Sequence, residues 1–303
     1  MRILLLGKDG QVGWQLQRSL APHGEVIACG RQECDLADAD RIRSVIRDTR
    51  PAVIVNASAY TAVDKAEAEA ELAFRINAEA PGILAEEAAA LGALLVHYST
   101  DYVYNGSKLS PYVETDPCDP QSVYGRSKLA GEEAIRAIGG KSLIFRTSWV
   151  FGARGGNFVK TILRLAREKE SLNVVDDQLG MPTPAALIAT VTGVVLAMLG
   201  QGRRLEKDES RLYHLAAAHP VSWCEFARVI VGLAGAMPGF ALRLPPDGVQ
   251  AIGTADYPTP ARRPANSRLD CNRLESDFGL QMPDWQPYLA RMLQLLALKQ
   301  NGY

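Results

Sequence analysis

The sequence predicts an α/β protein whose first half forms a doubly wound parallel sheet and whose second half adds a smaller α/β domain. Short apolar runs alternate with helical patterns through the first half. A glycine-rich turn directly follows the first of these runs. The second half is less regular and contains a proline-rich stretch. These observations indicate strands covered by helices on both sides, followed by a separate unit.

Five strands and four helices are expected in the first half. The apolar runs at 3–6, 26–29, 52–55, 94–97 and 143–146 predict strands. Helical patterns lie at 11–21, 37–49, 64–91 and 123–138. The third helix should be broken near Pro81, because proline disrupts a helix interior. The fourth should stop at Gly139 and Gly140.

The second half yields fewer elements. We expect helices at 158–169, 185–199 and 285–298, and strands at 172–175 and 212–215. The segment 183–216 forms a helix–strand unit that we expect to rejoin the first sheet. Residues 245–264 contain five prolines and should form an ordered loop. The predicted domains are therefore 1–150 and 151–303, the latter mainly 151–182 and 217–303.

Composition excludes several classes of protein. Lys plus Arg total 33 and Asp plus Glu total 34, so the net charge is −1 and the basic surface of a nucleic-acid binder is not expected. Five cysteines without a C-x-x-C motif fit neither a disulfide framework nor a zinc ribbon, and favour the reducing cytoplasm. The first apolar run is too short for a signal peptide, and the segment 185–199 is too short to span a membrane.

Three glycines follow the first strand with the spacing G-x-x-G-x-x-G: Gly7, Gly10 and Gly13. Such glycines let the backbone approach a pyrophosphate, and the following helix offers free N–H groups, here those of Gln11 and Val12. A glycine turn without a ligand is the alternative. The strand–turn–helix context favours a Rossmann-type dinucleotide-binding domain over residues 1–150.

The end of the second strand bears on the choice of dinucleotide. Arg31 suits the 2′-phosphate of NADPH, whereas an acidic residue here would suit the ribose hydroxyls of NADH. Arg31 therefore favours NADPH. Because the acidic residues Glu33 and Asp35 lie close by, NADH stays open. Asp35 and Leu36 are expected to flank the adenine.

Tyr124 and Lys128 lie four residues apart on a predicted helix and therefore share one face. A nearby ammonium stabilises a phenolate, so Lys128 is expected to lower the pKa of Tyr124 and ease proton donation to a ketone. An exposed helix face is the alternative reading. Thr100 follows the fourth strand and could donate a hydrogen bond to the carbonyl oxygen, or could only stabilise a turn. Gly7, Ser58, Thr100 and Trp149 each follow the end of a predicted strand and should therefore lie at one edge of the sheet.

These motifs resemble the extended short-chain dehydrogenase/reductase superfamily and, within it, the dTDP-4-dehydrorhamnose reductase family. The similar segments are 55–57, 61–67, 97–103, 123–132, 146–150, 177–183 and 257–267, so the resemblance spans nearly the whole chain. That family reduces the 4-keto group of dTDP-4-dehydro-β-L-rhamnose to dTDP-L-rhamnose, a precursor of bacterial surface polysaccharides. The resemblance implies the same activity, a dTDP-sugar as substrate, and a substrate-binding role for the second domain.

The resemblance also implies the roles of individual residues. Tyr124 would be the general acid, Lys128 its electrostatic partner and a ligand of the nicotinamide ribose, and Thr100 the residue that orients the carbonyl. The implied cofactor contacts are Gly10, Gln11, Val12, Asp35, Leu36, Ala59, Tyr60, Thr61 and Tyr98. The implied substrate contacts are Thr100, Asp101, Trp149, Asn157, Gln178 and Arg263.

Two positions depart from the family pattern. Some members carry glutamates that help bind magnesium at a dimer contact, where this chain has Gln15 and Ala186. An amide and a methyl group cannot replace carboxylates around a hard cation, so no metal site is expected, and a homodimer stays open. Two other functions also stay open: a nucleotide-sugar epimerase, and the NADP-binding regulatory subunit of methionine adenosyltransferase.

Overall fold

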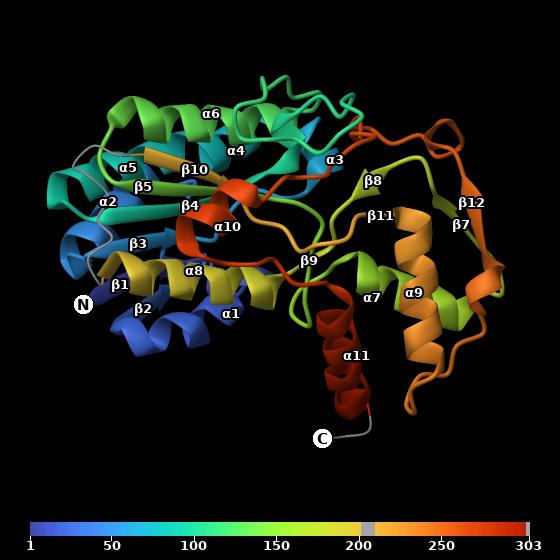
Figure 1. The fold of residues 1–303 in the computed structure, drawn as a ribbon. Helices are drawn as coiled ribbons and strands as arrows, with labels where there is room; N and C mark the ends of the chain where they lie inside the picture. The colour runs from blue at the N-terminus through green and yellow to red at the C-terminus, as the bar shows by residue number, and fades with distance from the viewer. Residues whose placement is uncertain (201–209, 301–303) are drawn as a thin grey trace.

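A computed structural model describes residues 1–200 and 210–300 of the chain. Its centre is a six-stranded, entirely parallel sheet with the order β10-β5-β4-β3-β1-β2 (Figure 1). The strands are β1 (Arg2–Leu6), β2 (Glu25–Cys29), β3 (Val53–Asn56), β4 (Leu94–Thr100), β5 (Ser142–Thr147) and β10 (Ser210–His214). The predicted Rossmann-type α/β fold is confirmed.

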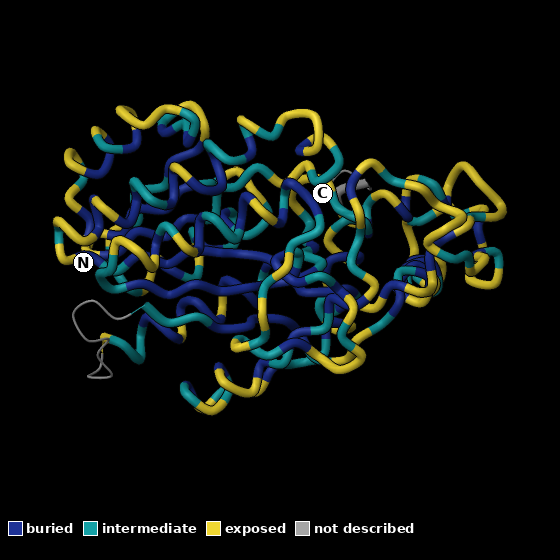
Figure 2. The backbone as a smooth tube through the Cα atoms, turned by 90° about the horizontal axis from the view of Figure 1, so that it is seen from above, coloured by how far each residue is buried: buried dark blue, intermediate teal, exposed yellow. Residues whose placement is uncertain are grey.

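Helices cover both faces of the sheet. Along β1, Ile3 and Leu5 belong to one apolar cluster, while Leu4 and Leu6 belong to another, as the alternation of side chains in a strand requires. The first cluster lies under α1 (Gln11–Leu20) and α8 (Ala185–Gly200), and the second under α2 (Ala39–Thr49), α5 (Ala80–Leu91) and α6 (Val123–Ile138). Figure 2 shows the strands buried between these exposed outer layers.

The predicted helix–strand unit in the second half does join the sheet. Helix α8 packs against α1, where Gly193 lets the two backbones approach: a Cβ there would lie 3.1 Å from the carbonyl oxygen of Ser19. Strand β10 pairs with β5, Ser210 opposite Ser142. Within the described residues, no helix is both long and apolar enough to cross a lipid bilayer.

The helical segment 64–91 is interrupted at a different place from the one predicted. Helices α3 (Val63–Ala66) and α4 (Ala70–Phe74) are separated by residues 67–69, whereas the chain runs unbroken through Pro81. A π-helical turn (Arg75–Glu79) leads into α5, and Pro81 occupies the first turn of that helix. Proline is tolerated in the first turn of an α-helix, so Pro81 does not end the helical segment.

A smaller lobe lies beyond the carboxyl ends of the strands (Figure 1). It contains the parallel pair β7 (Leu172–Val175) and β12 (Val249–Ile252) and the helices α7 (Phe158–Glu168), α9 (Trp223–Gly235) and α11 (Gln286–Gln300). Two short pairs, β6 (Val150–Phe151) with β9 (Thr183–Pro184) and β8 (Leu179–Gly180) with β11 (Val221–Ser222), and helix α10 (Asn272–Phe278) complete the fold.

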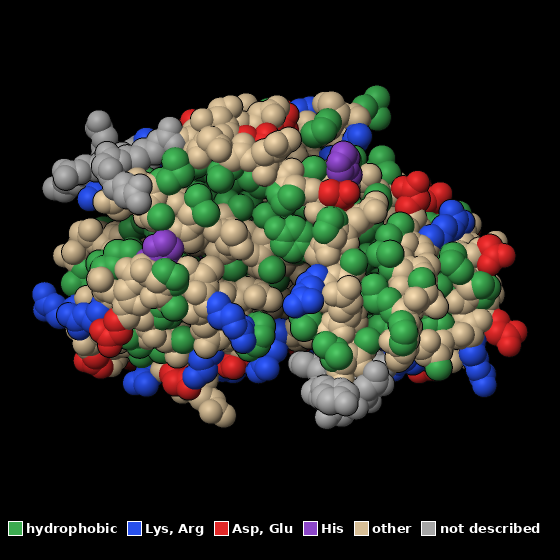
Figure 3. Space-filling model, turned by 60° about the horizontal axis from the view of Figure 1, so that its bottom comes forward, with side chains coloured by type: hydrophobic (Ala, Val, Ile, Leu, Met, Phe, Trp, Pro, Cys, Tyr) green, Lys and Arg blue, Asp and Glu red, His purple; other side chains and the backbone are tan. Residues whose placement is uncertain are grey.

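The segment 245–264 is therefore not only a loop, because β12 and two short 3-10 turns lie inside it. One buried apolar cluster, which includes Leu5, Phe151 and Trp285, continues from the sheet into the lobe. The domain boundary near residue 150 stays a prediction. On the face seen in Figure 3, acidic and basic side chains are interspersed, in line with the net charge of −1.

Candidate active site

The glycine turn lies where the direction of strand connections reverses, because β2 and β3 lie on opposite sides of β1. Gly7 has a φ of +88°, and a Cβ there would lie 2.8 Å from the backbone of Ala57 after β3. A Cβ on Gly13 would lie 1.9 Å from the carbonyl oxygen of Gly7. No side chain caps the start of α1 at Gly10, so its first N–H groups can face an anion.

The turn after β2 carries the residues expected to select the cofactor. Glu33 accepts a hydrogen bond from the backbone N–H of Gly30 (2.8 Å) and forms an ion pair with Lys8, from the glycine turn. The hydrogen bond between the two side chains raises the pKa of Lys8 and lowers that of Glu33. Arg31 is exposed on the same turn. Glu33, two residues after Arg31, is thus already paired with Lys8.

The loop after β3, with Ala59, Tyr60 and Thr61, is fixed by a residue that sequence reasoning missed. Asn77 accepts a hydrogen bond from the backbone N–H of Tyr60 (2.9 Å) and donates one to the Tyr60 carbonyl (3.0 Å). It also donates to Ser127 of α6 (3.0 Å). Leu36, expected beside the adenine, is 6% exposed and packs in the apolar cluster under α2.

Thr100 and Tyr124 meet at the carboxyl end of β4. The N-terminus of α6 is fixed by Ser122, whose hydroxyl accepts from the N–H of Gly125 (3.1 Å), and Tyr124 lies in this first turn. Burial raises the pKa of Tyr124, and a side-chain hydrogen bond with Thr100 lowers it. Thr100 in turn donates to Asp101 Oδ1 (3.0 Å), and burial raises the pKa of Asp101 to about 6.

Lys128 lies one turn beyond Tyr124 but does not act on it as predicted. Its Nζ donates to the backbone carbonyl of Tyr98 (2.7 Å) and lies 3.1 Å from Nε2 of His97. Burial lowers the pKa of Lys128 to about 8. The pKa of Tyr124 is raised rather than lowered, because burial dominates and the opposing hydrogen bond comes from Thr100. His97 has no strong sequence signal, since it ends an apolar run.

The predicted substrate residues near the strand ends differ in availability. Trp149 follows β5 with a φ of +46°, an uncommon backbone conformation for a bulky side chain. Its indole stacks on Trp223 (ring centroids 3.4 Å apart) and lies over Gly180, where a Cβ would approach it to 2.1 Å. Thr147 Oγ1 and Asp101 Oδ2 are buried without a hydrogen-bond partner among the described residues.

Three other predicted contacts are engaged within the protein. The Tyr98 hydroxyl bonds Thr192 of α8 (2.8 Å), because alternation along β4 turns this side chain into the core, and only its carbonyl faces Lys128. Asn157 is the N-cap of α7 and donates to Gln11 Oε1 (2.8 Å) and to the carbonyl of Gly152 (2.7 Å). Gln178 is 6% exposed and donates to Thr254 (3.0 Å). Asn157 and Gln178 thus position other groups.

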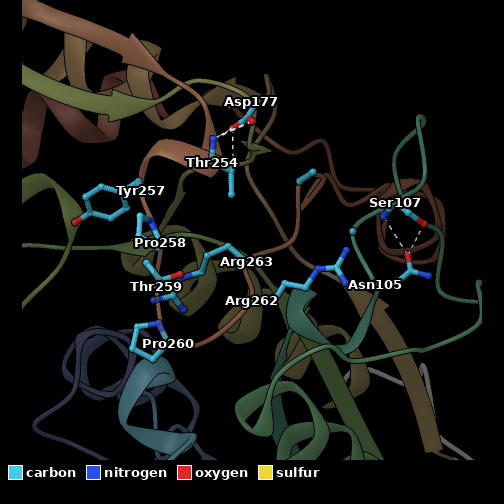
Figure 4. A pocket seen from close by; sticks show the side chains of 12 residues that line it. Asn105, Ser107, Asp177, Thr254, Tyr257, Pro258, Thr259, Pro260, Arg262 and Arg263 are labelled. Atoms are coloured by element: carbon cyan, nitrogen blue, oxygen red, sulfur yellow. Dashed lines mark hydrogen bonds between the residues drawn. The ribbon is translucent and has the colours of Figure 1, made fainter.

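A cavity of about 580 Å³ lies between residues 105–107 and the segment 254–265. Figure 4 shows Arg262 and Arg263 between these two walls. Arg263 is held by Asp64 at the start of α3 (2.6 Å) and reaches the hydroxyl of Tyr102 (3.5 Å). The ring of Tyr102 packs edge-on against Tyr124, with centroids 5.5 Å apart. The cationic wall is thereby connected to the residues at the end of β4.

Comparison with known proteins identifies full-length relatives. A family model described as "RmlD substrate binding domain" matches residues 1–298. A dTDP-4-dehydrorhamnose reductase from Burkholderia thailandensis is 48% identical over 94% of this chain and 96% of its own length. A solved dTDP-4-dehydrorhamnose reductase from Clostridium acetobutylicum superposes with a TM-score of 0.87, at 35% identity, covering 98% of this chain and 99% of that one. The reductase from Bacillus anthracis in complex with NADP gives 0.84, at 34% identity, covering 96% and 98%.

Proposed function

The chain belongs to the RmlD substrate-binding-domain family of dTDP-4-dehydrorhamnose reductases, and from this we propose that it reduces the 4-keto group of dTDP-4-dehydro-β-L-rhamnose to dTDP-L-rhamnose. Full-length relatives from Burkholderia thailandensis and Escherichia coli carry the name dTDP-4-dehydrorhamnose reductase. The five cysteines are all free thiols, in keeping with a reaction in the cytoplasm. The observation that carries the proposal is the placement of Thr100 at the carboxyl end of β4 and of Tyr124 in the first turn of α6, at the sheet edge that also bears the glycine turn.

The glycine turn fits a dinucleotide, because Gly7 and Gly13 leave no room for side chains and α1 begins without a capping group. Its neighbours would be Gln11, Val12, Asp35 and the loop at Ala59, Tyr60 and Thr61. When bound, a reduced nicotinamide supplies the hydride. Arg31 favours NADPH, and the relative from Bacillus anthracis was solved with NADP. Magnesium has no role in the proposal, since Gln15 and Ala186 offer no carboxylate.

Tyr124 is the proposed general acid, because it lies in the first turn of α6, next to the end of β4, and interaction with Thr100 lowers the pKa of its phenol against the effect of burial. It gives its proton to the ketone oxygen as the carbon receives the hydride. Burial raises the pKa of Tyr124, so the phenol holds its proton at neutral pH, and the interaction with Thr100, which lowers this pKa, favours donation. Thr100 orients the carbonyl, and Lys128 binds the nicotinamide ribose.

The substrate would extend from Thr100 and Asp101 toward the smaller lobe. Trp149, half-buried and stacked on Trp223, would border the sugar, and Thr147 Oγ1 and Asp101 Oδ2 would bond sugar hydroxyls. Arg263, with Arg262 beside it in the cavity wall, suits the diphosphate, because one guanidinium group can donate two parallel hydrogen bonds to phosphate oxygens.

Reduction consumes the nicotinamide, whereas an epimerase regenerates it. The test offers NADPH and NADH in turn with dTDP-4-dehydro-β-L-rhamnose and follows absorbance at the reduced-nicotinamide band. We expect one NADPH oxidised for each sugar converted. Sugar conversion without net oxidation would support the epimerase. No turnover of any keto-sugar, together with stable binding of a methionine adenosyltransferase, would support the regulatory role.

A further inference from the structure

A buried chain of polar groups leads from the end of β3 to Lys128. Asn56 lies opposite His97 in the pairing of β3 with β4, and its Nδ2 is 3.2 Å from His97 Nδ1. On the other side of the ring, His97 Nε2 is 3.1 Å from Lys128 Nζ. All three side chains are 1% exposed. Because all three side chains are shielded from solvent, the donors and acceptors of neighbouring groups must match one another.

The orientation of Asn56 fixes the direction of this chain. Its Oδ1 accepts a hydrogen bond from the backbone N–H of Ser58 (3.1 Å). Its Nδ2 is therefore the group that faces His97 and donates to Nδ1. A neutral imidazole has one proton, and because Nδ1 is an acceptor, that proton lies on Nε2. The Nε2–H group then points at Lys128 Nζ.

An ammonium has three donors and no lone pair, so it cannot accept this hydrogen bond. A neutral amine can accept from His97 Nε2–H and still donate to the Tyr98 carbonyl at 2.7 Å. We propose that His97, held in its Nε2–H tautomer by Asn56, is a positioning residue that disfavours the ammonium form of Lys128. With Lys128 as an amine, Ser58 donates to Asn56, Asn56 to His97, His97 to Lys128, and Lys128 to the carbonyl of Tyr98.

The other charged groups near Lys128 do not alter this assignment. On its own helix, Glu132 favours the ammonium, but its carboxylate accepts from Arg146 of β5 at 2.6 and 2.9 Å. Tyr124 remains protonated at neutral pH, since burial raises its pKa. Burial lowers the pKa of Lys128 to about 8 and lowers that of His97 well below its ordinary value. The ring of His97 therefore stays neutral while Lys128 titrates.

This part of the inference rests on the proposed reduction and concerns how that reaction depends on pH. The ammonium of Lys128 forms only when proton uptake overcomes both burial and the opposing Nε2–H group. His97 thus sets the pH range over which Lys128 changes charge, and through it the hydrogen bonds that Lys128 can offer beside Tyr124.

The direct test is nuclear magnetic resonance of the 15N-histidine-labelled wild-type protein without substrate. Two-bond 1H–15N correlations distinguish the tautomers, and the chain contains its own control. His214 is also buried, and its Nδ1 donates to the carbonyl of Asp270 (3.0 Å) while Nε2 accepts from Tyr104 (2.7 Å). We expect the Nε2–H form for His97 and the Nδ1–H form for His214. The Nδ1–H form at His97 would overturn the proposal.

Two variants extend the test. In Asn56→Asp a carboxylate can only accept from Nδ1, so His97 should switch to the Nδ1–H form, and an unchanged tautomer would contradict the proposed chain. In His97→Gln the amide oxygen can accept from an ammonium. The transition of Lys128 in the pH profile of kcat, near 8 in the wild type, should then move to higher pH, while burial still holds it below the ordinary lysine value of 10.5. His214→Gln, which leaves Lys128 untouched, should not move it.

An unmoved profile in His97→Gln would also count against the proposal. Because the resonance experiment uses neither substrate nor coenzyme, it can fail while the reduction of the keto-sugar stands. Equally, the absence of reductase activity would leave the tautomer of His97 measurable.

Discussion

Removing the charge of Glu132 should destabilise the protein strongly. Its carboxylate lies inside the sheet–helix interface with no exposed surface, and it pairs with Arg146, which is 1% exposed. Oε1 accepts from Arg146 Nε (2.9 Å) and from the hydroxyl of Ser99 (2.5 Å), and Oε2 accepts from Arg146 Nη2 (2.6 Å). In Glu132→Gln one of these acceptors becomes an NH2 group that faces another donor.

The magnitude follows from the buried guanidinium that this change leaves without a counter-charge. Breaking one side of a buried ion pair costs about 3–5 kcal/mol. Domains have a total free energy of unfolding of only about 5–15 kcal/mol, so the loss is a large fraction of it. Ser99 lies next to Thr100 on β4, and a loosened strand end should also lower catalytic activity.

Urea unfolding followed by both fluorescence and circular dichroism measures the loss. The matched control is Glu168→Gln, which breaks an exposed pair with Arg164 (3.3 Å) on α7 and should cost less than about 0.5 kcal/mol. If the two variants lost similar amounts of unfolding free energy, the buried pair would not be a major contribution to stability, and our reasoning about Glu132 would be refuted.

Four further results are expected. Lys128→Met should lower kcat about 10-fold or more and raise the KM for NADPH, since a hydrogen bond from a charged group contributes about 1.5–3 kcal/mol; an unchanged KM would remove its role at the ribose. In Gly13→Ala the new Cβ would lie 1.9 Å from a carbonyl oxygen, so coenzyme binding should weaken and the free energy of unfolding should fall by about 1–3 kcal/mol or more. Gly156→Ala places its Cβ in open space and should change the free energy of unfolding by about 0.5 kcal/mol at most. Equal effects of the two variants in calorimetry would contradict this. Arg31→Ala should raise the KM for NADPH about 10- to 100-fold and leave that for NADH unchanged, and a parallel rise would exclude a 2′-phosphate contact. Burial lowers the pKa of His214 from 6.5 to about 3, so as the pH falls the unfolded chain takes up this proton before the folded chain does. The free energy of unfolding should therefore fall below about pH 6.5, by up to about 1.4 kcal/mol per pH unit. His214→Gln should reduce this slope in urea titrations, and an unchanged slope would show that another group causes it.

Local signals were sufficient for much of the fold. The glycine turn, the apolar runs and the helix containing Tyr124 were predictable, because each is specified by neighbouring residues. The N-cap role of Asn157 was also visible, since an asparagine directly precedes the predicted helix at Phe158. The family resemblance implied a substrate contact for Asn157 instead.

Long-range features could not be found in this way. Strand β12 has only four residues, and its pairing partner β7 lies far away in sequence, so the surrounding prolines dominated the local pattern. Asn77 acts through Tyr60 and Ser127, which are 17 and 50 residues distant. The partners of His97 are likewise 41 and 31 residues away. Burial reversed the expected pKa shift of Tyr124, and burial is a property of the packed chain.

The role of Tyr124 as proton donor is tested most directly by comparing Tyr124→Phe with Tyr213→Phe in a single-turnover assay of NADPH oxidation by the dTDP-keto-sugar. Tyr213 is a matched control because its hydroxyl bonds Asp277 (2.7 Å), not the residues at the end of β4. The Tyr124 variant should be slower by about 10²- to 10⁴-fold, or about 3–5 kcal/mol in the barrier, and the control should stay close to wild type. Near-normal turnover without the Tyr124 hydroxyl would contradict the assignment.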